Sequence, residues 1–212
     1  MAETTKERLV AAASDLLDAG GQGAVTLRAV AEVVGVSHNA PYRHFLDRSA
    51  LLAAVAERDF DRLGQAFQAK ADDPQDARLS LRAALMVVVA YAREHPARYR
   101  LLFSDPNLVS GNGALEVAAF GSFQAFAAIV RRCQMDKSLR SIETARMTGL
   151  IYATLHGAID LEIGGRARKA KGLGSIEATV DLLLDLLAHP NVRNGSRADH
   201  RRVSTSSNDR GC

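Results

Sequence analysis

The 212-residue sequence lacks the features that define several large classes of protein. Its only cysteines, Cys133 and Cys212, have a spacing that fits neither a disulfide framework nor a set of metal ligands. No uninterrupted apolar run approaches the roughly 18 residues of a membrane-spanning helix. The opening segment, MAETTKERLVAAASDLLDAGG, is acidic as well as basic, unlike a secretion signal. We therefore expect a cytoplasmic protein with no membrane partner and with reduced, incidental cysteines.

The short motifs of common catalytic chemistry are also missing. The sequence has no H-E-x-x-H zinc motif, no phosphate-binding loop and no G-x-S-x-G nucleophile elbow, and KGLGS at 171–175 is too short to be such a loop. The histidines are scattered. We accordingly expect a protein that is not an enzyme and that has no metal site and no cofactor. A small enzyme, or a helical interaction module without DNA binding, is the alternative.

Most of the chain lacks an excess of charge of either sign. The formal net charge is +3, but residues 191–212 hold five arginines against two aspartates, so residues 1–190 are balanced. This C-terminal segment, NVRNGSRADHRRVSTSSNDRGC, has almost nothing apolar to bury, which predicts a disordered basic tail. A basic arm that touches DNA phosphates is the alternative interpretation.

The pattern of β-strands, in which Val, Ile or aromatic residues recur at every second position, is nearly absent. Apolar residues instead recur at three- and four-residue spacing throughout. The sequence therefore predicts an all-α fold. The polar segment ADDPQD at 71–76 breaks the helical pattern and is a candidate domain boundary. The helices are expected near residues 5–19, 27–34, 38–45, 48–69, 76–94, 96–104, 113–135, 141–164 and 175–188.

The segment VTLRAVAEVVGVSHNAPYRHF at 25–45 has the pattern of two short helices joined by a glycine-containing turn. This is the arrangement of a helix-turn-helix unit, whose second helix can lie in the major groove of DNA. Thr26 and Ser37 are expected to cap the two helices, and Gly35 to form the left-handed turn between them. With Ser37 as the cap, Pro41 falls in the first helical turn, where its missing N–H removes only one hydrogen bond.

The side chains of this segment suit a division between phosphate contacts and base reading. Arginine pairs with guanine and asparagine with adenine, while tyrosine and histidine tips reach phosphate oxygens or a thymine methyl group. The free N–H groups from Ser37 to Asn39 can also face a phosphate. Base-contact candidates are Arg28, His38 and Asn39, and phosphate-contact candidates are Tyr42, His44 and Arg48, whereas Phe45 should pack inward. The alternative is a helical hairpin in which Tyr42 and Phe45 are core residues and the polar side chains are merely solvated.

The segment VTLRAVAEVVGVSHNAPYRHFLDRSALL resembles the N-terminal domain of the TetR family of bacterial transcriptional regulators. The resemblance covers roughly the first 60 residues. By position it assigns phosphate contacts to Thr26, Tyr42, His44 and Arg48, and base contacts to Arg28, His38, Asn39 and Ala40. One departure is Arg48, because the family commonly has lysine there, although arginine serves phosphate as well or better.

The resemblance also implies an organisation and a function. It implies a helix-turn-helix DNA-binding domain at 1–48, a helical ligand-binding and dimerisation domain at 49–190, and the tail at 191–212. The expected function is a ligand-responsive repressor that binds a palindromic operator in double-stranded DNA as a homodimer. The sequence leaves open the small-molecule effector, the operator and the choice between repressor and activator.

The segment GALEVAAFGSFQAFAAIVRRC at 113–133 is apolar on nearly all sides, so we expect other helices to surround it. Bulky aromatic side chains beside alanine and glycine can leave a cavity between helices, although simple core packing is the alternative for the phenylalanines. The candidate ligand-binding residues are Tyr91, Phe103, Phe120, Phe123, Tyr152 and His156, with Tyr99 as a further lining residue.

The segment IYATLHGAIDLEIGG at 151–165 is similar to a motif of one TetR subgroup in which Trp precedes a His-Gly pair. Here Tyr152 takes the place of that Trp. His156 is either a ligand contact or a core histidine bonded to a neighbouring carbonyl, and the structural role is slightly favoured. Gly157 is expected to mark a close approach of helices, because a helical glycine otherwise costs stability.

The last two predicted helices have broad apolar faces that could pair across a two-fold axis as a four-helix bundle. Packing within one chain is the alternative. The predicted interface residues are Ile151, Leu155, Ala158, Ile159 and Ile163 in the first helix, and Ile176, Val180, Leu183, Leu184 and Leu187 in the second.

Overall fold

The computed structural model describes residues 3–106, 108 and 113–190, and the predicted basic tail at 191–212 lies outside them. Within these ranges the chain is almost entirely helical and has no β-strand beyond one isolated bridge, which confirms the all-α prediction. The elements are α1 (Thr5–Gly20), η1 (Gln22–Ala24), α2 (Leu27–Val34), η2 (Pro41–Arg43), α3 (Arg48–Ala71), α4 (Ala77–Glu94), α5 (Pro96–Ser104), α6 (Ala114–Met135), α7 (Thr144–Ile163), η3 (Lys169–Lys171) and α8 (Ile176–Leu187).

Local sequence signals explain where many of these helices begin. Helix α1 starts with a capping box, in which the Thr4 N–H donates to Glu7 Oε2 at 2.7 Å and the Glu7 N–H donates to Thr4 Oγ1 at 3.2 Å. Four further helices begin at a side chain that accepts a hydrogen bond from their first turn, namely Thr26, Asp47, Asp76 and Ser175.

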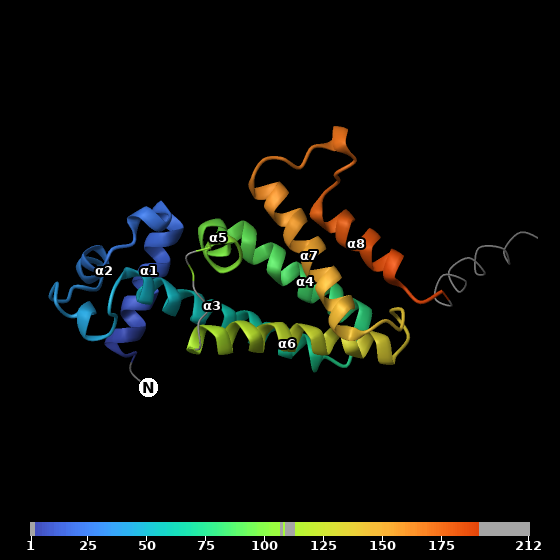
Figure 1. Ribbon diagram of the computed structural model, residues 1–212, viewed down its shortest axis with the longest axis horizontal. Coiled ribbons are helices and arrows are strands. Elements are labelled where there is room, and N and C mark those ends of the chain that lie inside the picture. The colour runs from blue at the N-terminus through green and yellow to red at the C-terminus, as the bar shows by residue number, and fades with distance from the viewer. Residues whose placement is uncertain (1–2, 107, 109–112, 191–212) are drawn as a thin grey trace, which may run out of the picture.

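The elements α1, η1, α2 and η2 gather at one end of the molecule and are called the head below, while α3 to α8 are called the body (Figure 1). Helix α3 begins beside the head and continues into the body, so it belongs physically to both. The head has its own buried residues, among them Leu9, Val30 and Phe45. The burial of Phe45 confirms the prediction that it packs inward.

Helices α3 and α6 form the long axis of the body and lie close together (Figure 1). A Cβ atom at Gly64 of α3 would lie 3.4 Å from the Cα atom of Ser122 in α6, so glycine at this position allows the two backbones to approach. Helices α4 and α7 pack against α6 as well, and α8 covers α4 and α7 from outside. The expectation that other helices surround α6 is met on one side only, because Val117, Phe120 and Met135 lie exposed on its outer face.

Helix α6 is long and apolar enough to cross a membrane, and it is the one such helix among the described residues. Of its most apolar 18-residue window, 39% is buried inside the structure. Because the core helix of a helical bundle passes the same test of length and composition, this is weak evidence for a membrane span.

The apolar faces predicted for dimer contact are largely used inside the subunit. Ile151, Ile159 and Leu184 are at most 1% exposed, and the other seven predicted interface residues are buried or half-buried. The prediction is wrong for the seven buried residues, since each helix buries that face against its own neighbours, whereas the half-buried Ala158, Ile163 and Leu183 stay a prediction. Gly157, in contrast, has no heavy atom within 4 Å of the position its Cβ would occupy, so it marks no close approach within the subunit.

A buried ion pair fixes the short helix α5 to α3. Arg98 and Asp59 are 5% and 1% exposed, and the Arg98 Nε–H donates to Asp59 Oδ2 at 2.8 Å, while Nη2 pairs with Oδ1. The Tyr91 hydroxyl of α4 donates to the same Oδ2 at 2.9 Å. The Arg98 Nη1–H reaches Asp18 of α1 at 3.2 Å. One guanidinium therefore joins the body to the head through carboxylates of two different helices.

Breaking this pair should cost much of the stability of the fold. We predict that Asp59→Ala lowers the free energy of unfolding by about 3–5 kcal/mol, because it leaves the Arg98 charge buried without its main partner. Chemical denaturation of the purified protein measures this value. The matched control is Asp61→Ala two residues away, where the carboxylate is exposed and a change within about 0.5 kcal/mol is expected. Equal destabilisation by both variants would contradict the importance given to the pair.

Candidate DNA-binding surface and ligand pocket

The turn after α2 has the predicted left-handed geometry. Gly35 has φ +73° and ψ 35°, and its N–H donates to the Glu32 carbonyl at 3.2 Å. The Val36 N–H donates to the Ala31 carbonyl at 3.0 Å, which completes the helix end. Thr26 caps α2 as predicted, with its Oγ1 accepting from the Ala29 N–H at 3.0 Å.

The predicted second helix of the unit is not a continuous α-helix. Only Pro41–Arg43 form a helical turn, and that turn is of the 3₁₀ type and lacks a side-chain cap, so the prediction that Ser37 caps an α-helix is wrong. The cause is Pro41, which has no N–H to donate to the Ser37 carbonyl four residues back. That carbonyl instead accepts from the Ala40 N–H at 2.9 Å, a three-residue bond that tightens the backbone.

Most side chains of this tightened segment, residues 37–44, are exposed, and the segment is called the ridge below. Pro41 and Phe45 are buried beneath it, whereas Tyr42 is 61% exposed. Tyr42 is therefore not a core residue, which removes the alternative of a buried hairpin for that side chain. The other exposed residues of the ridge are Ser37, His38, Asn39, Arg43 and His44, and Ala40 is half-buried.

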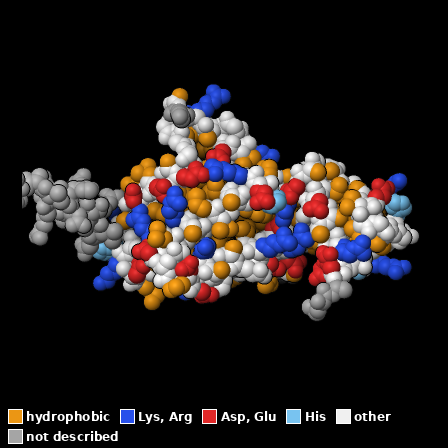
Figure 2. Space-filling model, turned by 180° about the vertical axis from the view of Figure 1, so that it is seen from behind, with side chains coloured by type: hydrophobic (Ala, Val, Ile, Leu, Met, Phe, Trp, Pro, Cys, Tyr) orange, Lys and Arg blue, Asp and Glu red, His pale blue; other side chains and the backbone are white. Residues whose placement is uncertain are grey.

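Two arginines beside the ridge already have partners in the head. Arg28 forms an exposed pair with Glu32, with Nε and Oε1 3.0 Å apart. Arg48 donates from Nε to the Val25 carbonyl at 2.7 Å and from Nη2 to the Gln22 carbonyl, so part of its guanidinium holds the η1 turn against α3. On the face shown in Figure 2, basic, histidine and acidic side chains are mixed at the head end of the molecule.

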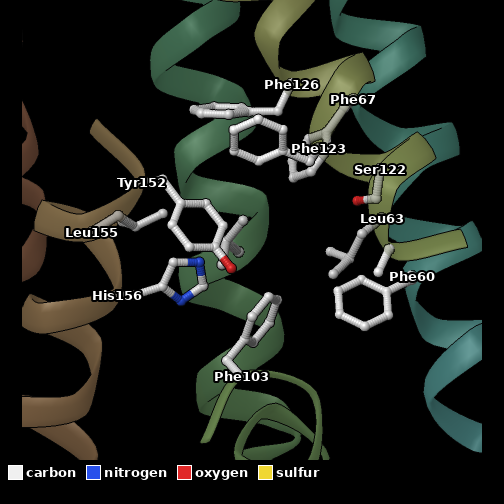
Figure 3. Close-up of a pocket in the computed structure, with 12 residues that line it drawn as sticks. Phe60, Leu63, Phe67, Phe103, Ser122, Phe123, Phe126, Tyr152, Leu155 and His156 are labelled. Carbon is white, nitrogen blue, oxygen red and sulfur yellow. The ribbon is translucent and has the colours of Figure 1, made fainter. Parts of the chain in front are cut away.

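A cavity of about 110 Å³ lies among helices α3 to α7 of the body (Figure 3). Phe103, Phe123, Tyr152 and His156 line it, as the sequence predicted. The lining residues that sequence reasoning did not propose are Phe60, Leu63, Phe67, Val88, Ala119, Ser122, Phe126 and Leu155. Phe60, Leu63 and Phe67 recur at helical spacing, but the same spacing marks ordinary core residues, so it could not single them out.

Three predicted lining residues do not line the cavity, and one of them, Tyr99, instead contacts the lining residue His156. Tyr91 instead bonds to the buried Asp59, as described above. Phe120 is 62% exposed on the outer side of α6. It follows Ala119 by one residue and is therefore turned by about 100° from the face that carries Ala119, Ser122 and Phe123.

His156 has its protonation state fixed by the pocket. The Tyr99 hydroxyl of α5 lies 2.6 Å from His156 Nδ1. Burial lowers the pKa of His156 to about 4 and raises the pKa of Tyr99, so the imidazole is neutral and the phenol keeps its proton. Nδ1 is the one hydrogen-bond partner of the Tyr99 hydroxyl among the described residues, so we assign the buried phenol as the donor, which places the ring proton of His156 on Nε2. The partner is a hydroxyl rather than the neighbouring carbonyl that the sequence interpretation considered.

Aromatic rings surround this histidine. The ring centroids of Tyr152 and Phe103 lie 4.1 Å and 4.3 Å from that of His156. Burial also raises the pKa of the Tyr152 phenol. Among the described residues, no group of three His, Cys, Asp or Glu side chains could hold a metal ion.

An exposed helix-turn-helix ridge on a helical body with an apolar pocket is the architecture of a DNA-binding regulator. Comparison with known proteins gives the same class. Residues 9–55 match the family model described as bacterial regulatory proteins, tetR family, and residues 81–187 match the tetracyclin repressor-like C-terminal domain. The chain belongs to the TetR family of transcription regulators, which are non-enzymatic. The C-terminal match does not identify the Trp/His-Gly subgroup.

Several solved structures share this fold. A protein of unknown function from Rhodococcus sp. RHA1 is 28% identical, with a TM-score of 0.73 over 89% of this chain and 97% of that one. A putative tetR family transcription regulator from Shewanella sp. PV-4 is 17% identical, with a TM-score of 0.62 over 88% of this chain and 99% of that one, and is similar in fold alone.

Two relatives carry the name nucleoid occlusion factor SlmA. The protein of Shewanella amazonensis is 23% identical over 159 residues, which are 73% of this chain and 80% of that protein. The protein of Haemophilus ducreyi is 33% identical over 82 residues, which are 39% of this chain and 41% of that protein.

Protonation of His156 should make the fold sensitive to acid. Because its folded pKa of about 4 lies below the ordinary value of 6.5, the unfolded chain takes up this proton first as the pH falls. We predict that its contribution to stability is fully present above pH 6.5 and falls by up to about 3 kcal/mol between pH 6.5 and pH 4. Urea unfolding at a series of pH values measures this loss. His156→Gln should flatten the curve over that interval, whereas His38→Gln, at an exposed position, should not. An unchanged curve for His156→Gln would contradict the neutral buried histidine.

Proposed function

We propose that this protein is a ligand-responsive repressor that acts in the cytoplasm as a homodimer on a palindromic operator. In this proposal residues 1–48 bind double-stranded DNA, residues 49–190 bind a small-molecule effector and the second subunit, and residues 191–212 form the tail. The observation that carries it is that one short helix, α5, contacts both the pocket and the head.

The exposed ridge supports the DNA-binding part of the proposal. Tyr42, His44, Thr26 and Arg48 contact phosphates, and the backbone N–H groups near Ser37 add to these contacts. The side chains that face base edges are Arg28, His38, Asn39 and Ala40. Arg28 is released from its exposed pair with Glu32, which costs little because both partners are solvated. Arg48 contributes through the donors that its bonds to the η1 turn leave free.

The unused faces of α7 and α8 support dimerisation. Leu150, Leu182 and Leu186 are 49%, 60% and 54% exposed. Gly149, Ala153 and Gly157 are also exposed and recur every four residues along α7, so they form one smooth stripe on the same helix. Small residues let helices approach closely, and this stripe beside exposed leucines suits a partner helix related by a two-fold axis. The interface residues thus differ from those that the sequence predicted.

Helix α5 connects the pocket to the DNA-binding head, because it contacts both. Phe103 lines the cavity and Tyr99 bonds to His156, while the neighbouring Arg98 bonds to Asp18 of the head. At the end of α5, Asp105 Oδ2 accepts from Gln22 Nε2 of the head at 2.5 Å. A ligand that displaces α5 therefore displaces these contacts to the head and changes the spacing of the two ridges in the dimer.

Binding to the DNA that flanks the protein's own gene tests the proposed function. We predict that Tyr42→Ala weakens binding to all duplexes to a similar extent, because it removes a phosphate contact, and that Asn39→Ala reduces the preference for the operator. Fluorescence anisotropy with operator and scrambled duplexes measures both effects. Identical behaviour of the two variants would contradict the division into phosphate and base contacts. If the folded dimer bound no duplex at low salt, an interaction module would replace the repressor.

The salt dependence of operator binding should be shallow. With about two cationic contacts per subunit, the log–log slope of affinity against salt concentration is expected near −4 for a dimer. Titrations between low and moderate salt measure the slope. A slope near −10 would show that the arginine-rich tail or the basic segment at 166–171 also binds DNA, which the proposal does not include.

The dimer should depend on the exposed leucines of α8. We predict that the double substitution Leu182→Glu and Leu186→Glu produces a monomer at micromolar concentration, because it places four carboxylates in one symmetric interface. Sedimentation velocity measures the mass. The control is Val117→Glu, a 74% exposed apolar position on α6 away from this face, which should remain dimeric. A monomeric wild-type protein would remove the proposed interface.

A further inference from the structure

The pocket of the body contains polar groups but no charge. Among the described residues that line it, none is Asp, Glu, Lys or Arg. The polar side chains are Ser122, Tyr152 and the neutral His156. A carboxylate or ammonium group buried here would lose its hydration without gaining a counter-charge, which is strongly unfavourable. The lining therefore selects against charged ligands.

Two hydrogen-bond donors stand together on one wall of the cavity. The bond from Tyr99 to Nδ1 leaves His156 with a proton on Nε2, so this nitrogen can only donate. Tyr152 lies one turn before His156 on α7, and the two ring centroids are 4.1 Å apart. Figure 3 shows the Tyr152 hydroxyl pointing into the space between the helices, beside the imidazole. These two donors suit an oxygen atom that accepts hydrogen bonds.

The remaining walls suit a flat ring. Phe60 and Phe103 meet edge to face, with centroids 5.5 Å apart and planes at 85°. Phe123 and Tyr152 meet in the same way at 5.8 Å and 73°. Rings that present both edges and faces to one space can receive a further aromatic ring in favourable edge-to-face contact.

The size of the cavity limits the ligand to about one ring. Its volume is about 110 Å³. An apolar protein cavity of about 150 Å³ holds one benzene molecule, and pockets for drug-sized ligands measure about 300–1,000 Å³. A compound with a single ring and a short substituent fits with small side-chain movements, whereas a multi-ring compound does not.

We propose that the effector is an uncharged single-ring aromatic compound with a carbonyl or hydroxyl oxygen that accepts hydrogen bonds from Tyr152 and His156. This proposal rests on the proposed function only in naming the ligand an effector. The binding itself is a property of the pocket and can be measured without DNA.

Isothermal titration calorimetry of the full-length dimer with four small probes tests the proposal. Acetophenone has the ring and the carbonyl oxygen, ethylbenzene lacks the oxygen, benzoate carries a negative charge and phenylethylammonium a positive charge. We expect saturable binding of acetophenone, about five- to a hundredfold weaker binding of ethylbenzene, which is the effect of losing two hydrogen bonds, and no binding of the two charged probes. Charged probes that bind as tightly as acetophenone, or acetophenone that does not bind to the folded dimer, would overturn the proposal.

Variants locate the binding within the pocket. Tyr152→Phe removes one donor and keeps its ring, so it should reduce the affinity for acetophenone several-fold and leave that for ethylbenzene unchanged. His156→Phe removes the other donor but introduces a larger ring, so it should lower the affinity for acetophenone more than that for ethylbenzene. Tyr42→Phe removes the same hydroxyl from the exposed ridge and should change neither. Equal loss of both probes in the two pocket variants, or no loss of acetophenone, would overturn the assignment of the donors. The comparison of probes on the wild-type protein stands even if a variant fails to fold.

Measurements with operator DNA separate this proposal from the proposed function. Acetophenone that binds the pocket without changing operator affinity would support the ligand class and contradict ligand control of DNA binding. Operator binding by a dimer that takes up none of the probes would contradict the ligand class and leave the DNA-binding function in place.

Discussion

The ion pair between Asp59 and Arg98 is the interaction on which the rest of this structure depends. It is buried, and together with the buried side chains of Tyr99, Leu101 and Leu102 it fixes the nine-residue helix α5. A helix this short is marginal in isolation, so its position comes from tertiary contacts. Because Arg98 also bonds to Asp18, the same side chain helps to hold the body against the head. The position of α5 in turn places Phe103 at the wall of the cavity and Tyr99 against the lining residue His156.

The ion pair buries full charges, whereas the pocket contains only uncharged polar groups. At the ion pair, full charges are buried because each has several partners at short distance. One residue further along α5, Tyr99 donates to His156, and the imidazole is kept neutral by burial. Neighbouring residues of one helix thus serve a charged network on one side and an uncharged cavity on the other. This arrangement places the uncharged cavity and the charged contact to the head on the same short helix.

Features with a local cause were predictable from the sequence. The cap at Thr26, the left-handed Gly35 and the burial of Phe45 each follow from residue type and spacing, and the structure confirms all three. The sequence predicted that Pro41 would remove one hydrogen bond from an α-helix. The structure shows a larger effect at the same place, because the missing N–H converts the turn to the 3₁₀ type. The family resemblance of the first 60 residues reflected the same local signals.

Features that depend on contacts between distant helices were not predictable. Asp59 and Arg98 are 39 residues apart, and nothing in either local sequence marks them as a buried pair. The choice between Phe120 and Phe123 depends on the rotation of α6 against its neighbours, which periodicity on an almost wholly apolar helix does not fix. For the same reason the apolar faces of α7 and α8 could not be divided into an inner face and an outer face. Each of these outcomes is decided by packing rather than by propensity.

The central claim is that occupancy of the cavity is transmitted through α5 to the DNA-binding head. The most direct test is the operator affinity of an Ala119→Phe variant, in which a new ring fills the cavity from α6 without any added ligand. If the claim is right, the folded dimeric variant binds its operator at least tenfold more weakly than the wild-type protein does. Unchanged operator affinity, with the new ring shown crystallographically to occupy the cavity, would contradict it.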